Sequence, residues 1–376
     1  MYTREYKNTG KQISILGLGC MRLPKLDPEK PDIDEPKAFE MVDYAYNHGI
    51  NYFDTAWPYH GEMSEEFVGR ALKKYPRDSF YLATKMPVWL VNTPEDAERI
   101  FAKQLEKLQT DYFDFYLLHA TNAERLEGWK KSGVYDVCRK LKEEGKIRHL
   151  GFSFHDKPEV LEQIVDQFEF DFAQIQFNYL DYELQDAKKQ YEILESHHIP
   201  TVVMEPVRGG ALADLCEESN AIFKAADPSA SVASWALRYA MNPDNIMVVL
   251  SGMSNMEQLK DNIHTAETFR KLTPEEEAVI AKALDVFKKN NTVPCTACRY
   301  CQPCPMGVEI PRIFTAWNQY RITKNANNFK STYSEIPDEA QAHNCVACGA
   351  CMEQCPQHIQ IPDLMTEIAN AYEALK

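Results

Sequence analysis

The chain is predicted to fold as a (β/α)₈ TIM barrel followed by a small, mainly helical, cysteine-rich domain. Two observations lead to this. Eight short apolar runs alternate with eight amphipathic segments between about residue 16 and residue 268, and eight of the eleven cysteines lie within residues 295–355. Eight strand–helix units are the number that closes a parallel barrel. We expect the barrel over residues 1–270, and a linker helix with the cysteine-rich domain over residues 271–376.

The apolar runs have no polar face, as expected for parallel strands that are covered by helices. They occupy residues 14–19, 50–54, 80–85, 113–119, 147–153, 172–178, 200–206 and 246–252. The helix-like segments between them are residues 35–48, 63–74, 94–108, 133–144, 157–167, 185–197, 230–241 and 255–267. An open doubly wound sheet is the alternative, but no G-x-G-x-x-G follows the first run.

Beyond the barrel, Thr273-Pro274-Glu275-Glu276 combines a hydroxyl cap, a first-turn proline and early acidic residues. This combination predicts the start of the linker helix. Residues 312–335 are polar, compatible with a helix and free of cysteine, so they separate the two groups of cysteines.

Composition excludes several classes of partner. The formal net charge of -15 and the pI of about 5.2 disfavour nucleic acid and anionic lipid. Charges interrupt every apolar run before it could cross a bilayer, and the charged N-terminus has no signal region behind it. These features predict a cytoplasmic protein with no membrane and no nucleic-acid partner.

Polar groups at the ends of three consecutive strands form the candidate active site. Asp54, Lys85 and His119 end the second, third and fourth runs, and Tyr59 follows in the second loop. In a barrel these side chains face one cavity. We expect Lys85, held by Asp54, to lower the pKa of Tyr59, which then acts as the general acid for a carbonyl polarised by neutral His119. A single such residue is more often structural, but four complementary ones together favour catalysis.

The segments "FDTAWPYHGEMSEEFVGRAL", "ATK", "DFYLLH", "GFS", "QIQFN" and "SGMSNMEQLKDNI" resemble the aldo-keto reductases over about residues 10–268. The resemblance implies an NAD(P)(H)-dependent barrel whose catalytic residues are Asp54, Tyr59, Lys85 and His119. It implies nicotinamide contacts from Ser153 and Gln176. It implies adenosine contacts from Ser251, Gly252, Met253, Ser254, Gln258 and Asn262. The remaining candidate cofactor contacts are Gly19, Cys20, Met21, Met204, Glu205, Pro206, Val207, Arg208 and Gly209.

Three departures from that family's pattern affect the cofactor. No Arg or Lys accompanies Ser254, and Lys260 is the nearest basic residue, so NADH is favoured over NADPH. Met204 and Glu205 stand where a Tyr often stacks on the nicotinamide, and Met can fill that apolar slot. Arg208 has two interpretations, a diphosphate contact or a surface ion pair. Phe154 replaces an Asn that often follows Ser153, and His155 is expected in solvent or behind the site.

The cysteines form two similar groups about 50 residues apart. The second, Cys345, Cys348, Cys351 and Cys355 before Pro356, has the spacing of bacterial ferredoxins, in which the fourth Cys ligates the neighbouring cluster. The first is Cys295, Cys298, Cys301 and Cys304, with a last gap one residue shorter. We expect two 4Fe–4S clusters, one on Cys295, Cys298, Cys301 and Cys355, the other on Cys345, Cys348, Cys351 and Cys304. Structural zinc is the alternative.

The whole chain resembles a branch of aldo-keto reductases fused to a ferredoxin-like domain. This implies an oxidoreductase that reduces a small carbonyl substrate, with clusters for electron transfer, sensing or structure and a possible redox protein partner. Hydride carries two electrons and a cluster one, so direct exchange calls for a flavin or a radical-tolerant substrate, and the sequence has no flavin motif. The alternative is a nucleotide-responsive sensor or electron-transfer subunit of a larger anaerobic complex. Trp57, Trp89 and Trp129 are candidates to line an apolar pocket or simply to pack.

Overall fold

The computed structural model describes residues 1–7, 9–288, 292–323 and 326–375. The chain divides into two compact units, Met1–Val207 with Ala236–Leu272, and Arg208–Trp235 with Thr273–Lys376. The second unit therefore takes in a segment that lies between strands of the barrel in the sequence. The domain limits at residues 270 and 271 remain a prediction of the sequence pattern.

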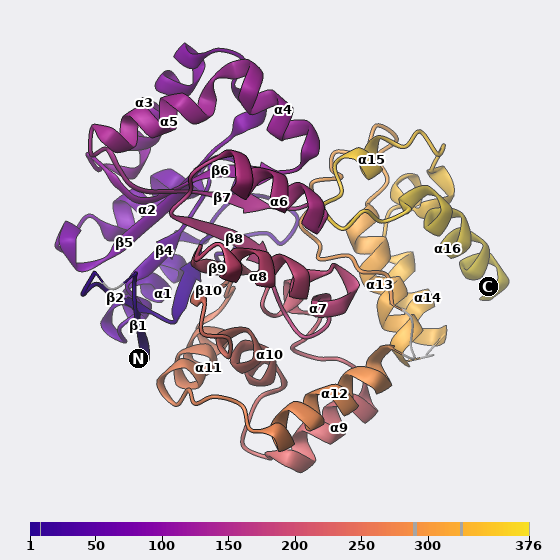
Figure 1. Ribbon diagram of the computed structural model, residues 1–376. Coiled ribbons are helices and arrows are strands. Elements are labelled where there is room, and N and C mark those ends of the chain that lie inside the picture. The colour runs from indigo at the N-terminus through magenta and orange to yellow at the C-terminus, as the bar shows by residue number, and fades with distance from the viewer. Residues whose placement is uncertain (8, 289–291, 324–325, 376) are drawn as a thin grey trace. The chain divides into compact units, whose positions relative to one another are not determined.

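The first unit is a closed barrel of eight parallel strands, which confirms the predicted fold class (Figure 1). The strands run in the order β10-β3-β4-β5-β6-β7-β8-β9 around the barrel. Their bounds are β3 (Leu16–Gly19), β4 (Tyr52–Asp54), β5 (Tyr81–Met86), β6 (Phe113–Thr121), β7 (Ile147–Phe154), β8 (Phe172–Gln176), β9 (Thr201–Met204) and β10 (Ile246–Ser251). Every strand overlaps one of the eight apolar runs, so the open-sheet alternative is wrong.

Each predicted barrel helix is present. These are α1 (Glu35–Asn47), α2 (Ser64–Leu72), α3 (Pro94–Leu108), α5 (Val134–Glu143), α6 (Pro158–Gln167), α8 (Ala187–Ser196), α10 (Val232–Met241) and α11 (Met256–Glu267). The sequence analysis missed α4 (Ala123–Ser132), α7 (Asp181–Leu184) and the hairpin of β1 (Thr3–Glu5) and β2 (Gln12–Ser14). Short 3₁₀ turns are η1 (Arg77–Ser79), η2 (Val88–Leu90) and η3 (Arg208–Gly210). None of the described helices is long and apolar enough to span a membrane.

Two layers of apolar side chains hold the barrel together. Aromatic and branched residues such as Phe115, Phe172 and Val248 fill its interior with Tyr6, which follows β1 and stands edge-on to Phe115 at 5.6 Å. A larger layer packs between strands and helices. The interior is thus a packed core rather than a channel, and polar chemistry is left to the carboxyl ends of the strands.

The second unit is helical. It contains α9 (Glu217–Ala226), α12 (Pro274–Lys288), α13 (Ile310–Thr323), α14 (Ala326–Ser334), α15 (Ala350–Glu353) and α16 (Ile361–Leu375), with 3₁₀ turns η4 (Asp338–Ala340) and η5 (Ala342–Asn344). The predicted cap of α12 is present, because Thr273 and Glu276 each accept a hydrogen bond from the other's backbone N–H. Ser219 of α9 donates to the Ala283 carbonyl oxygen of α12 at 2.8 Å. The cysteine segments pack on a separate core that includes Ile313, Trp317 and Met365.

Candidate active site

A buried ion pair lies at the carboxyl ends of neighbouring strands β4 and β5. Lys85 Nζ lies 2.6 Å from Asp54 Oδ1 and donates a second hydrogen bond to the Thr55 carbonyl oxygen at 2.9 Å. Both side chains are buried. Burial raises the pKa of Asp54, and the neighbouring ammonium works against that rise. Holding Lys85 at two points leaves little freedom in the position of its charge.

A second buried network fixes the backbone beneath Lys85. Gln104 of α3 donates to the Lys85 carbonyl oxygen at 2.9 Å and to Glu65 Oε1 at 2.6 Å. Thr84 donates to the same Glu65 oxygen at 2.7 Å. Buried polar networks of this kind are rigid because every broken contact leaves an unsatisfied group. The network therefore positions the end of β5.

Tyr59 lies beside this pair. The Lys85 ammonium is 5.0 Å from the Tyr59 ring centre, and the ring meets the His119 imidazole edge-on at 6.1 Å. Burial raises the pKa of Tyr59 well above its usual value, and the charges of Asp54 and Glu205 act in the same direction. The net pKa of Tyr59 is thus raised and not lowered as expected, because burial dominates. Tyr59 is a neutral phenol, which can donate a proton.

His119 completes the four. It lies on β6 and is buried, and its Nδ1 has no hydrogen-bond partner among the described residues. Burial lowers the pKa of His119 well below its usual value, and Lys85 and Arg125 add to the effect. The imidazole is thus neutral near pH 7, as the sequence analysis expected. Trp89 lies 5.2 Å from the imidazole, and the Arg125 guanidinium stacks over Trp89 at 5.1 Å. Trp129 instead packs among phenylalanines in the core.

The residues expected at the nicotinamide lie at the ends of β7 and β8. Ser153 is buried and its hydroxyl accepts a hydrogen bond from the Ala120 backbone N–H at 2.7 Å. Gln176 donates to Asp181 Oδ2 at 2.9 Å, and Asn178 donates to the same oxygen at 2.7 Å. Both candidate side chains are therefore oriented by neighbours at the barrel mouth.

The expected adenosine residues form a compact loop between β10 and α11. Asn262 donates to Ser251 Oγ at 2.9 Å, and the Ser254 backbone N–H donates to Gln258 Oε1 at 2.8 Å. Met253 is buried in the barrel core, so only its backbone can serve a ligand. The structure thus brings these residues together as a small-residue turn that opens a helix.

Arg22 is a cation that the sequence did not point to. It lies in the loop after β3 and contacts the loop between β10 and α11. The aliphatic part of its side chain packs against Gly252, so closely that a Cβ added to that glycine would lie only 3.2 Å from it. The Arg22 backbone carbonyl oxygen accepts a hydrogen bond from Ser254 Oγ at 2.9 Å. Its guanidinium lies 3.6 Å from Glu205. No basic residue is close to Ser254 in the sequence, but Arg22 is close to it in the folded chain. Its position in the loop after the first strand, three residues after Gly19, was the sequence feature that could have identified it as a cofactor contact.

The other candidate cofactor residues fall on two loops. Cys20 and Met21 follow Gly19 at the end of β3, and Cys20 is buried, with its backbone N–H bonded to the Asp54 carbonyl oxygen at 2.8 Å. Met204 ends β9, and after it come Glu205, Pro206, Val207, Arg208 and Gly209. Glu205 has a left-handed φ of 55°, and within the part of the chain that the structure describes its buried Oε2 has no hydrogen-bond partner.

Arg208 begins the second unit and contacts the cysteine segment. It is buried and donates to the Pro294 carbonyl oxygen at 3.2 Å. This contact supports neither the diphosphate nor a surface ion pair. The assignment of Arg208 to the cofactor remains a prediction.

The eight clustered cysteines surround two cavities. The first is lined by Cys295, Cys298, Cys301 and Cys355, together with Ile310 and other apolar side chains. Burial raises the pKa of Cys295 and of Cys301 to about 12, and the Arg208 charge opposes this at Cys295. This set takes three cysteines from the first group and Cys355 from the second, which is the crossed arrangement expected from the ferredoxin spacing.

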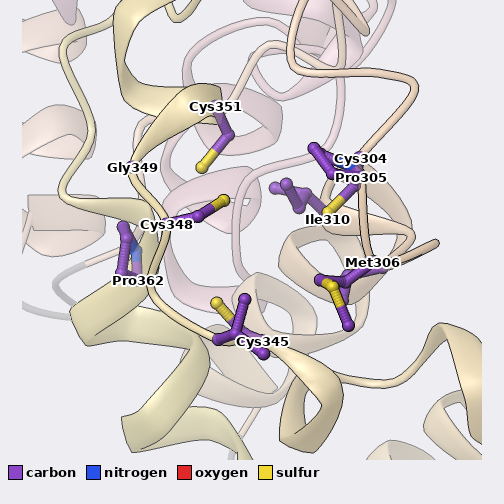
Figure 2. Close-up of a pocket in the computed structure, with 11 residues that line it drawn as sticks. Cys304, Pro305, Met306, Ile310, Cys345, Cys348, Gly349, Cys351 and Pro362 are labelled. Atoms are coloured by element: carbon purple, nitrogen blue, oxygen red, sulfur yellow. The ribbon is translucent and has the colours of Figure 1, made fainter.

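Figure 2 shows the second cavity, with Cys304, Cys345, Cys348 and Cys351 around it. Among the described residues no group of three or more His, Cys, Asp or Glu side chains converges to hold a metal ion, and the sulfurs of each set surround an open space. Four thiols around an apolar space fit an iron–sulfur cluster, whose thiolate ligands are spread around it.

Comparison with known families identifies both regions. Residues 15–285 match the model of the aldo/keto reductase family, and residues 294–359 match that of a 4Fe–4S dicluster domain. The chain belongs to the aldo/keto reductase family. It is an oxidoreductase with a C-terminal 4Fe–4S domain, so structural zinc is not favoured.

Relatives and solved structures extend along the barrel of this reductase. It is 29% identical over 306 residues to the uncharacterized oxidoreductase YqkF of Bacillus subtilis, covering 73% of this chain and 94% of that one. It is 26% identical to the NADH-specific methylglyoxal reductase of Escherichia coli, covering 67% and 89%. The holo form of aldo-keto reductase AKR11C1 from Bacillus halodurans has a TM-score of 0.63 at 27% identity, covering 75% and 96%.

The low pKa of His119 gives the reductase a pH-dependent stability. A His whose pKa falls on folding adds stability above its unfolded pKa of about 6.5, and this is lost as the pH falls. We expect His119→Gln to reduce the dependence of unfolding free energy on pH below about 6.5 by up to ~1.4 kcal/mol per pH unit. Urea unfolding between pH 5 and pH 7 measures this. An unchanged slope would mean that His119 is charged when folded. His197→Gln, on the surface near Asp166, is the control.

Proposed function

We propose that this reductase reduces an aldehyde or ketone with NADH, with Tyr59 as the general acid. The observation that carries the proposal is the buried pair of Lys85 and Asp54 beside a neutral Tyr59 and a neutral His119. Nicotinamide, when bound, supplies the hydride. The test is carbonyl-dependent oxidation of NADH by wild type and by Tyr59→Phe.

The protein side chains supply the proton and the polar contacts. Tyr59 gives its proton to the carbonyl oxygen as negative charge develops there, and Lys85 stabilises the resulting phenolate. Asp54 keeps the ammonium in place. Neutral His119 polarises the same oxygen without competing as an acid, because burial keeps it unprotonated. Trp89, beside His119, is placed to limit access to this side of the site.

The residues at the ends of β7 and β8 and the turn that contacts Arg22 suit a dinucleotide. Ser153 and Gln176 lie at strand ends, the turn from Ser251 opens α11, and Arg22 supplies a cation on that turn. Helix N-termini and adjacent cations suit phosphate groups. The Arg22 guanidinium is directed to Glu205, so it suits the diphosphate better than a 2′-phosphate. A relative described as NADH-specific also supports NADH.

Arg22→Met is expected to weaken NADH binding about 10- to 100-fold, since a charge-assisted hydrogen bond contributes about 1.5–3 kcal/mol. The affinity for NADPH should fall by the same factor if Arg22 binds the diphosphate. Fluorescence titration of both nucleotides measures this, with Arg99→Met on the surface as the control. A loss confined to NADPH would contradict this role and the preference for NADH.

Electron transfer to a protein partner remains a second candidate. One observation favours it. Cys348 is exposed, and Val346 and Met306, which line the same cavity, are 60% and 45% exposed. A cluster held there would lie near the surface, where a redox partner could reach it.

A further inference from the structure

Arg208 is a buried cation next to the first cysteine group. It is only 2% exposed, and its guanidinium donates at 3.2 Å to the carbonyl oxygen of Pro294, the residue before Cys295. A buried arginine stays charged, and its field is screened less than that of a surface charge.

The two cysteine cavities differ in the charges around them. The cavity of Cys295, Cys298, Cys301 and Cys355 has one charged lining residue, Arg299, and its charge is offset by Glu309 at 3.1 Å. The cavity of Cys304, Cys345, Cys348 and Cys351 has only uncharged lining residues. Because Glu309 offsets Arg299, the lining residues leave the two cavities similar in net charge, and the buried Arg208 lies next to the first of them.

We propose that Arg208 raises the reduction potential of the cluster on Cys295, Cys298, Cys301 and Cys355 and makes it the higher-potential cluster of the two. Reduction adds one electron to a cluster. A nearby positive charge stabilises the reduced state, and exposure and net charge are known determinants of cluster potential. Among the described residues, none that lines the more exposed second cavity is charged. An electron shared between the clusters then rests mainly on the first.

The inference rests on the proposed two-cluster assignment, and its test separates the two. The anaerobically purified full chain is titrated with dithionite, and reduction is followed by electron paramagnetic resonance after iron analysis. Arg208→Gln should lower one of the two potentials by at least 59 mV, a tenfold change for one electron. The other potential should not move. Too little iron for two clusters would defeat the assignment, whereas unmoved potentials at full iron content would defeat the role of Arg208.

Three further variants identify the cause. Arg208→Lys keeps the charge and should stay near the wild-type potential; a shift as large as that of Arg208→Gln would overturn the electrostatic explanation. Val346→Lys adds a cation at the second cavity and should raise the other potential. If it moves the same cluster as Arg208→Gln, the assignment of Arg208 is wrong. Arg312→Gln, in a surface pair with Glu335, is the control and should move neither. If Arg208→Gln does not assemble, Arg208→Lys and Val346→Lys still decide.

Discussion

Tyr59→Phe is expected to lower kcat for carbonyl reduction by about 10²–10⁴-fold, the usual contribution of general acid catalysis. The phenylalanine ring keeps the edge-on contact with His119 but carries no proton to donate. Removing a hydroxyl from a buried site without adding volume should leave NADH affinity unchanged. Loss of kcat with unchanged nucleotide binding is the signature of a group that acts only in the transition state.

Steady-state oxidation of NADH with an aldehyde, together with fluorescence titration of NADH, measures both quantities. Tyr46→Phe is the matched control, because its hydroxyl meets Ser79 on the surface and takes no part in the site. It should keep full activity. Tyr59→Phe with more than a tenth of the wild-type kcat would mean that the proton comes from another group.

Pairs of cysteine substitutions should show that the clusters are ligated crosswise. Cys355→Ala is expected to remove about half of the bound iron. Adding Cys295→Ala should remove no more, because both sulfurs line the same cavity. Adding Cys345→Ala instead should remove the second cluster as well, because Cys345 lines the other cavity.

Iron and sulfide analysis of the anaerobically purified variants measures this directly. The opposite pattern, in which Cys295→Ala with Cys355→Ala removes all iron, would show that each group ligates its own cluster. Cys138→Ala, at a buried barrel cysteine far along the chain from both groups, is the control and should keep all iron.

The sequence predicted the barrel well for a local reason. Parallel strands that are covered on both faces consist of short apolar runs. A run such as the one that ends at His119 can be recognised from the local sequence alone. The candidate catalytic residues follow from the same pattern, because the carboxyl ends of parallel strands meet at one edge. Asp54 and Lys85 are 31 positions apart, yet they lie on neighbouring strands and form one ion pair.

Features that depend on burial or on distant contacts could not be predicted. Local sequence gives no measure of how deeply Tyr59 lies, so its pKa was assigned the wrong direction. Arg22 and Ser254 are more than 200 residues apart and meet because β3 and β10 are paired in the closed barrel. Arg208 follows β9 in the sequence, but its contact with Pro294 belongs to the second unit.

The proposed reduction is tested most directly by following the hydrogen itself. NADH deuterated at the transferable C4 position is incubated with the reductase and an aldehyde, and the alcohol is examined by mass spectrometry and NMR. Direct reduction at Tyr59 predicts one deuterium on the carbinol carbon of the product. An alcohol whose new carbon-bound hydrogen comes from solvent would contradict hydride transfer in the barrel and would assign the reduction to one-electron chemistry.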